Sequence, residues 1–234
     1  MRHLLFVLAL ALLAAPTFAD AQGKHLFILS GQSNMAGMDP DLTFTPTVYE
    51  ALGKDHVIVV KYALGAAPIR HWYKKWKPAE GEQPEGHKAW IYDRLIRKVN
   101  KAIKDQTIVS VTFIWMQGER DAKEKHGEVY AVSMRGVIDQ LAGDLQREHI
   151  NFVIGRLSDF DLNNERYAHW TMVRDAQVKV AEDDDRGDWV DTDDLNDGLN
   201  KKGKAIKNDL HYSVQGYKTL GKRFAEKAIA LIKE

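Results

Sequence analysis

Apolar residues in this chain follow two alternating patterns, one of strand length and one of helical spacing. The strand-length apolar runs occupy residues 25–29, 57–62, 108–116 and 152–157. Apolar positions at helical spacing occupy residues 90–103 and 129–145, and a last helix is expected over residues 214–232. Nearly continuous apolar strands that alternate with amphipathic helices are typical of a parallel sheet covered on both faces. The pattern therefore predicts an α/β fold, a three-layer α/β/α sandwich with a central parallel sheet.

The same pattern predicts where a ligand binds. In open parallel sheets, ligands bind beyond the carboxyl ends of the strands, so residues that directly follow each strand are the first candidates for chemistry.

The chain has 234 residues, 44% of them hydrophobic, and shows no internal repeat or linker. This size is usual for one domain with its own core.

The N-terminus has the composition of a secretory signal peptide. Met1, Arg2 and His3 precede an apolar run over residues 4–15, and small residues follow around Ala19 and Ala21. The run is shorter than the roughly 20 apolar residues of a transmembrane helix. We therefore expect a signal peptide over residues 1–21, a single mature domain over residues 22–234, and export to the periplasm or the medium without stable membrane insertion. An uncleaved membrane anchor is the alternative.

Charge and cysteine content narrow the range of partners. The 33 basic and 33 acidic residues cancel, so no broad field attracts nucleic acid, and a neutral substrate fits this balance best. The absence of cysteine excludes disulfides, thiolate metal sites and a catalytic thiol. The nine histidines show no HExxH pattern, and no phosphate-binding GxxxxGK[ST] loop occurs. We expect neither a metal nor an organic cofactor, and the oligomeric state stays open.

The polar stretch over residues 74–88 predicts a long surface loop, either a binding loop or a mobile insertion. In and around this stretch, Arg70, Trp72, Trp76 and Trp90 could offer faces to a sugar ring, or could equally be core or surface residues.

The first candidate for chemistry follows the first strand, where residues 30–37 read SGQSNMAG. Glycines on both sides of Ser33 permit a tight turn that lifts its hydroxyl to the edge of the sheet. The spacing differs from the GxSxG elbow because the second glycine comes later. Alternatively, Ser33 or Asn34 only caps the following helix.

The second candidate follows the strand at 108–116, where residues 115–121 read WMQGERD. These polar side chains are expected to face the ligand crevice. The neutral amide of Gln117 can donate to an oxyanion without bringing a charge. Glu119 and Asp121 are alternatively acids that bind free amides at a helix start.

The third candidate lies ahead of the last helix, where residues 208–213 read NDLHYS. A serine needs a base to take its proton, and an imidazole needs a partner that holds its orientation. An isolated histidine is more often structural, but here an acid stands beside His211.

Together the three blocks, in this order, resemble the SGNH (GDSL-like) hydrolases, and within them the sialate O-acetylesterase and acetylxylan esterase group of carbohydrate esterases. That group carries a GQSNM block near the N-terminus, a QGE block in mid-chain and an acid-histidine block before the last helix. The match covers nearly the whole mature chain. It implies a flavodoxin-like sheet and a cofactor-independent esterase whose partner is an acetylated carbohydrate.

The resemblance also implies residue roles. Ser33 would be the acylated nucleophile, with its own amide as one oxyanion donor, and His211 would act as general base and then acid. Gln117 would be a side-chain oxyanion donor, and Gly65 would supply a further backbone donor. Asn34 and Glu119 are expected to support the site.

Two departures from the group leave alternatives open. Relatives often carry two consecutive glycines where this chain has Gly65 and Ala66, and an alanine would be strained if that position needs a positive φ. Many relatives place the aspartate three residues before the histidine, where this chain has Asn208. Asp209 is the preferred partner of His211 because a carboxylate stabilises the imidazolium, whereas Asn208 could orient the ring without charge.

The expected function is removal of O-acetyl groups from a carbohydrate, either a xylan-like polysaccharide or sialic acid, by a Ser-His-Asp acyl-enzyme mechanism. The alternatives are lipase-like or thioesterase activity on the same scaffold, since a fold does not fix a substrate, and an inactive relative that only binds carbohydrate.

Overall fold

A five-stranded, entirely parallel sheet with the order β2-β1-β3-β4-β5 forms the centre of the protein. The structure is a computed structural model that describes residues 23–82, 84 and 89–233. The predicted signal peptide over residues 1–21 lies outside the described residues, as do residues 83 and 85–88 of the predicted loop.

The strands of the sheet are β1 (Lys24–Gly31), β2 (Val57–Ala63), β3 (Ile108–Met116), β4 (Asn151–Gly155) and β5 (Gly187–Val190). The α-helices are α1 (Ser33–Gly37), α2 (Phe44–Leu52), α3 (Trp90–Ile103), α4 (Glu119–Lys123), α5 (Tyr130–Asp144), α6 (Trp170–Glu182) and α7 (Val214–Lys233). Short 3₁₀ helices occupy Pro40–Leu42, Lys54–His56, Ile69–His71, Gly127–Val129 and Asp159–Asp161. A two-stranded antiparallel hairpin, β6 (Gly198–Leu199) with β7 (Ala205–Ile206), precedes the last helix.

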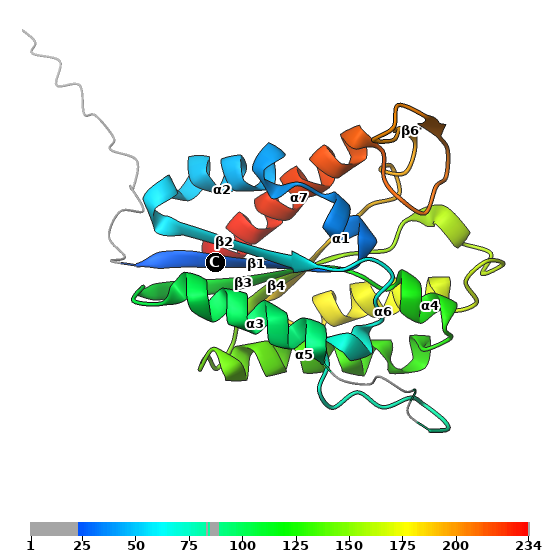
Figure 1. The fold of residues 1–234 in the computed structure, drawn as a ribbon, viewed down its shortest axis with the longest axis horizontal. Helices are drawn as coiled ribbons and strands as arrows, with labels where there is room; N and C mark the ends of the chain where they lie inside the picture. The colour runs from blue at the N-terminus through cyan, green and yellow to red at the C-terminus, as the bar shows by residue number, and fades with distance from the viewer. Residues whose placement is uncertain (1–22, 83, 85–88, 234) are drawn as a thin grey trace, which may run out of the picture.

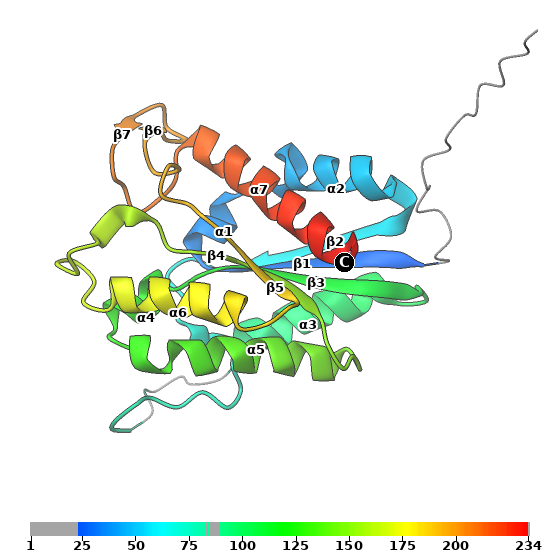
Figure 2. The ribbon, with the colours of Figure 1, turned by 180° about the vertical axis from the view of Figure 1, so that it is seen from behind.

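Helices cover both faces of the sheet. Helices α2 and α7 lie together on one face, and α3, α5 and α6 lie on the other (Figure 1), an arrangement that the view from behind repeats (Figure 2). The central strands carry unbroken buried runs, because both of their faces pack against helices. The three-layer α/β/α sandwich predicted from the sequence is confirmed.

The predicted elements correspond to β1 to β4, α3, α5 and α7, with boundary shifts of a few residues. The elements that the sequence pattern did not predict include α2, α6 and β5, which complete the three layers. Helix α6 buries Arg174 and Gln177 as well as apolar residues, which obscures its amphipathic pattern. Strand β5 is only four residues long and begins with Gly187 and Asp188.

The strand order creates a crevice between β1 and β3. From β1 the chain runs to the outer strand β2, and it then crosses to β3 on the other side of β1. This is the flavodoxin-like order, in which ligands bind where the connections diverge at the carboxyl ends of the strands. In Figure 1 the strands point toward the end of the molecule that carries α1, α4 and the β6 hairpin.

Among the residues that the structure describes, no helix combines the length and apolar character that crossing a bilayer demands.

Candidate active site

Ser33 stands at the first position of α1, directly beyond the end of β1. Gly31 has a φ of 144°, and a Cβ there would lie 1.9 Å from the carbonyl oxygen of Met116, so only glycine fits. The next amide, Gln32 N, donates to that same carbonyl oxygen at 2.9 Å. The end of β1 is thus fixed against the end of β3, and the following turn carries Ser33 to the edge of the sheet.

A cleft of about 360 Å³ lies at this edge. Its lining comes from four separate segments: Gln32 and Ser33, Gly65 and Ala66, Glu119 with Arg120 and Lys123, and Leu210 with His211; Tyr167 completes it. The structure therefore brings Ser33, Gly65, Glu119 and His211 together in one cleft, although they lie far apart in sequence.

Backbone amides suited to an oxyanion surround Ser33. No side chain caps the start of α1, so the Ser33 amide is among the first-turn N–H groups that lack a helical acceptor. Gly65 lies close by, because a Cβ placed on it would be 3.8 Å from the Ser33 Cβ. Ala66 has a φ of 57°, the left-handed conformation in which glycine is favoured. Such strain at a functional loop costs roughly 1–3 kcal/mol and must be held by its surroundings.

Gln117 does not reach the cleft. Its side chain is fully buried, and its amide nitrogen lies 2.5 Å from Asp121 Oδ2, 3.1 Å from the Ala67 carbonyl oxygen and 3.2 Å from Gln32 Oε1. Its Oε1 accepts from the Tyr130 hydroxyl at 3.1 Å. An amide with two hydrogens and three protein acceptors has none left for an oxyanion. This placement differs from the expectation that Gln117 is a direct oxyanion donor.

Asp121 lies beneath the cleft floor and does not line it. Its carboxylate accepts from the Ile69 amide at 2.9 Å and from Gln117. Burial raises the pKa of Asp121 to about 7. Asp121 therefore binds the amide of Ile69, which begins the 3₁₀ helix Ile69–His71.

Asn34 connects the nucleophile helix to the histidine loop. Its Nδ2 donates to the Leu210 carbonyl oxygen at 3.1 Å, and its Oδ1 accepts from the Tyr212 amide at 3.4 Å. Both residues that flank His211 in sequence are therefore bound to the residue that follows Ser33. The Tyr217 hydroxyl also donates to Asn34 Oδ1, at 3.1 Å.

Glu119 extends this connection and faces the cleft. Its Oε1 accepts from Asn34 Nδ2 at 2.9 Å, and the side chain is only 2% exposed. Its Oε2 is buried and has no hydrogen-bond partner among the described residues. Burial, the largest cause, raises the pKa of Glu119 to about 7.

His211 lies on the open rim of the cleft with Asp209 beside it. The His211 amide donates to Asp209 Oδ1 at 2.9 Å, and the ring Nδ1 lies 3.9 Å from the same oxygen. The two side chains are 49% and 42% exposed. At that distance the pair is an ion-pair contact when the ring is protonated, and it is too long for a hydrogen bond.

Asn208 is directed away from the histidine. Its Oδ1 accepts from Asn196 Nδ2 at 3.2 Å, and its Nδ2 donates to the Phe160 carbonyl oxygen at 3.3 Å. With a φ of 43°, it turns the chain into the histidine loop. Of the two candidate partners of His211, the structure places only Asp209 near the ring.

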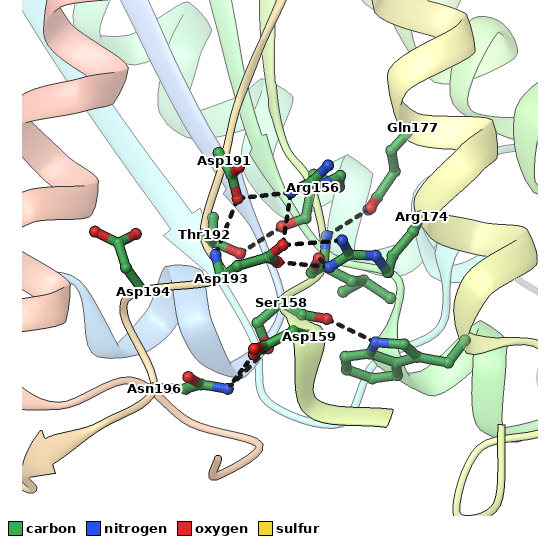
Figure 3. A network of polar contacts seen from close by, with 12 residues as sticks. Arg156, Ser158, Asp159, Arg174, Gln177, Asp191, Thr192, Asp193, Asp194 and Asn196 are labelled. Atoms are coloured by element: carbon green, nitrogen blue, oxygen red, sulfur yellow. Dashed lines mark hydrogen bonds and ion pairs between the residues drawn. The ribbon is translucent and has the colours of Figure 1, made fainter. Parts of the chain in front are cut away.

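A polar network joins the segment after β5 to α6 and to the loop after β4 (Figure 3). Asp193, on the chain after β5, binds Arg174 through both carboxylate oxygens at 2.7 and 3.1 Å, and it contacts Arg156 at 2.9 Å. Asn196, in the same segment, donates to Asp159 Oδ1 at 3.0 Å.

The segment after β5 then reaches the histidine loop itself. Asp209 N donates to the Asn196 carbonyl oxygen at 3.3 Å, and Ser213 N donates to the Leu195 carbonyl oxygen at 3.0 Å. The sequence pattern did not predict that the segment after β5 binds the histidine loop. The one available signal was the dense DTDDLND run at residues 191–197, whose arginine partners cannot be assigned by spacing.

Three further cleft residues were also missed. Arg120 and Lys123 present cations to the cleft, and Tyr167 presents an aromatic ring. Lys123 Nζ lies 5.7 Å from the centre of that ring. Trp72 and Trp76, considered as sugar-facing residues, are instead fully buried in the core.

Comparison with known proteins identifies a family for this chain. A family model described as "carbohydrate esterase, sialic acid-specific acetylesterase" matches residues 36–230. No curated protein sequence matches the chain.

Solved structures share the fold at low sequence identity. An Arabidopsis thaliana protein is similar with a TM-score of 0.65 and 19% identity, over 89% of this chain and 98% of that chain. A carbohydrate acetylesterase from Xanthomonas citri has a TM-score of 0.61 and 15% identity, over 91% of this chain and 57% of that chain. The protein NanS has a TM-score of 0.60 and 12% identity, over 91% and 98% of the two chains.

The fold and the family match define a carboxylic ester hydrolase with a three-layer α/β/α fold. The chain belongs to the sialic acid-specific acetylesterase family of carbohydrate esterases. Membership supports hydrolysis of acetyl esters as its reaction.

Proposed function

We propose that this protein removes O-acetyl groups from an acetylated carbohydrate through an acyl-enzyme formed on Ser33. The observation that carries the proposal is the shared cleft of Ser33 and His211, in which Asn34 binds the backbone on both sides of the histidine. A serine and a histidine that line one cleft can supply the nucleophile and the base that a serine esterase requires.

The reaction proceeds in two halves. His211 takes the proton of the Ser33 hydroxyl while Oγ attacks the acetyl carbonyl carbon, and the carbonyl oxygen becomes an oxyanion. The bond to the sugar oxygen then breaks, and His211 gives its proton to that oxygen. A water molecule next attacks acetyl-Ser33 with His211 again as base, and collapse of the second oxyanion releases acetate and returns the proton to Ser33.

Backbone amides and a carboxylate stabilise the charges that develop. The amides of Ser33 and Gly65 are the proposed backbone donors to the oxyanion. Asp209 is the proposed partner of the imidazolium, because its carboxylate is 3.9 Å from the ring nitrogen whereas Asn208 is bound elsewhere. This assignment rests on position and not on a formed ring hydrogen bond.

Export and processing form a separate proposal. The signal-like composition of residues 1–21 supports cleavage near Ala21 and activity outside the cytoplasm. The mass of the exported protein tests this cleavage directly. Loss of the residues up to about Ala21 is expected, and an intact N-terminus would contradict the proposal.

The decisive test of function is acetate release from acetylated xylan and from O-acetylated sialic acid, with Ser33→Ala as control. We expect release from at least one substrate by the wild type and none by the variant. Equal release by both proteins contradicts the role of Ser33. A panel of p-nitrophenyl esters tests the acyl group, and a preference for long chains would favour lipase-like activity instead.

A further inference from the structure

Gln32 joins the cleft to the buried network beneath it. Its side chain is 3% exposed and lines the cleft next to Ser33. Its backbone is already bound, because Gln32 N donates to the Met116 carbonyl oxygen and its own carbonyl oxygen accepts from Ala36 N. The polar group of Gln32 still available for a ligand is therefore in its side chain.

The orientation of the Gln32 amide follows from an unambiguous donor. The Arg120 backbone N–H can only donate, and it lies 3.2 Å from the Gln32 atom assigned as Oε1. Gln117 Nε2 lies 3.2 Å from the same oxygen. These two donors therefore hold the Gln32 amide oxygen on the buried side. The amide nitrogen, Nε2, then points in the other direction.

The Gln32 Nε2 donor is open to the cleft. Over the described part of the chain, no protein acceptor lies within hydrogen-bond distance of this nitrogen, and it is not among the buried unpartnered atoms. A donor that is fixed in direction, accessible and without a protein partner is what a developing negative charge requires.

Gln117 in turn fixes Gln32. Its Nε2 shares two hydrogens among Gln32 Oε1, the Asp121 carboxylate and the Ala67 carbonyl oxygen, so its contact with Gln32 adds to the hydrogen bond from Arg120 N. This buried chain of hydrogen bonds leaves little rotational freedom to the Gln32 amide. Gln117 is accordingly a positioning residue that acts through Gln32.

We propose that Gln32 Nε2 is the side-chain donor to the oxyanion that forms when Ser33 attacks the acetyl carbonyl. The inference rests on the proposed function of the same site and reassigns the side-chain donor from the QGE block to the residue before the nucleophile. Nε2 adds a neutral, directed hydrogen bond to those of the Ser33 and Gly65 amides.

Two substitutions separate the donor from the acceptor of this side chain. Gln32→Glu keeps an oxygen for Arg120 N and Gln117 and replaces the Nε2 donor with a second oxygen. Gln32→Met removes donor and acceptor without adding charge. With p-nitrophenyl acetate as substrate, we expect kcat of both variants to fall by about 10²- to 10³-fold while KM changes by less than about threefold.

An oxyanion mimic supplies a readout that a merely structural role would not move. 1,1,1-Trifluoroacetone adds to the serine as a hemiketal whose oxyanion occupies the same site. We expect its inhibition constant to rise in both variants by about the factor by which kcat/KM falls. Gln117→Met, which leaves Arg120 N to hold Gln32, should lose less activity than Gln32→Met.

Several results would overturn the inference. These are Gln32→Glu activity within about threefold of the wild type, a fall in kcat without weaker inhibition by the ketone, and a larger loss in Gln117→Met than in Gln32→Met. An active wild type with an equally active Gln32→Glu variant refutes only the role of Gln32. A wild type that hydrolyses no acetyl ester refutes the proposed function and this inference together.

Discussion

The floor and the rim of the cleft are built differently. On the floor, Gln32 and Glu119 are at most 3% exposed, and hydrogen bonds hold the amide oxygen of Gln32 and one carboxylate oxygen of Glu119. On the rim, His211 and Asp209 are about half exposed, and the ring nitrogen lies 3.9 Å from the carboxylate. The groups that would face the oxyanion are thus rigid and desolvated. The His211 ring, in contrast, is held in place mainly through the backbone of its own loop.

This difference indicates how mutations should act. A lost hydrogen bond on the floor leaves a buried polar group without water, which costs roughly 1–3 kcal/mol for each group. A lost ion pair on the rim costs little, because solvent and salt screen exposed charges. The comparison predicts that substitutions of floor residues and of Asn34 have large effects on activity or stability. Substitution of Asp209 on the rim should have a smaller effect.

Outside the proposed nucleophile, base and oxyanion donors, the largest effect is expected for Asn34→Ala. This substitution leaves Glu119 Oε1, the Leu210 carbonyl oxygen and the Tyr212 amide without their partner. We expect kcat/KM to fall about 100-fold or more and the free energy of unfolding to fall by about 3 kcal/mol. Steady-state kinetics and urea denaturation measure both quantities.

Asn151→Ala is the matched control for Asn34→Ala. Asn151 is a buried asparagine of β4 that donates to the Leu231 carbonyl oxygen at 2.9 Å, away from the cleft. It should lower stability and leave kcat/KM nearly unchanged. Equal loss of activity in the two variants would mean that Asn34 acts only through stability.

Glu119→Gln should change how stability depends on pH. The folded protein retains a proton on Glu119 up to about pH 7, whereas the unfolded chain releases it near 4.5, the ordinary pKa of a glutamate side chain. Between these values the folded state binds more protons, so the free energy of unfolding falls as pH rises. The contribution of Glu119 to this fall is on the order of 3 kcal/mol.

Denaturation of the wild type and Glu119→Gln at pH 4.5 and pH 7.5 measures that contribution. The variant should lose less stability over this interval. A remaining fall is expected from Asp121, whose pKa burial also raises to about 7. An equal fall in both proteins would show that Glu119 titrates near its ordinary value.

Asp209→Asn should have a moderate effect. Because the pair is exposed, we expect kcat/KM to fall about tenfold or less, well below the roughly 10⁴-fold loss found where the triad acid is buried. Asn208→Gly, which suits the φ of 43°, should change kcat/KM by less than about threefold. Esterase kinetics of the two variants side by side decide between the residues, and a larger loss from Asn208→Gly would reverse the assignment.

The smallest effect concerns Ala66. Its φ of 57° is unfavourable for alanine, so Ala66→Gly should relieve strain and raise the free energy of unfolding by about 0.5–1 kcal/mol after the larger chain entropy of glycine is subtracted. Ala67→Gly is the control, because Ala67 is buried and has no positive φ. Chemical denaturation should show opposite signs, and two destabilised variants would argue against strain at Ala66.

Much of the fold could be predicted from the sequence because its central strands are plain apolar runs. The elements at 25–29 and 108–116 are buried on both faces, and their composition alone indicates this. The carboxyl-edge rule then placed the SGQSNMAG and WMQGERD blocks side by side. Helix α6 escaped prediction because Arg174 and Gln177 occupy buried positions that a hydrophobic pattern assigns to apolar residues.

The function of individual amides could not be predicted in this way. Whether Gln117 or Gln32 faces the substrate depends on which acceptors already bind the Gln117 amide, namely the Asp121 carboxylate in the same block and the Ala67 carbonyl oxygen from a distant segment. A motif shows which side chains lie near one another and not which hydrogen atoms are already donated. By contrast, the suspected strain at Ala66 followed from the sequence, because an alanine stands where relatives often carry a glycine.

Covalent labelling of the nucleophile tests the central claim most directly. A fluorophosphonate should modify Ser33 alone, identified by peptide mass spectrometry, and His211→Ala should slow the reaction by about 10³-fold or more. Labelling at another serine, or an equal rate in His211→Ala, would contradict a nucleophile at Ser33 activated by His211.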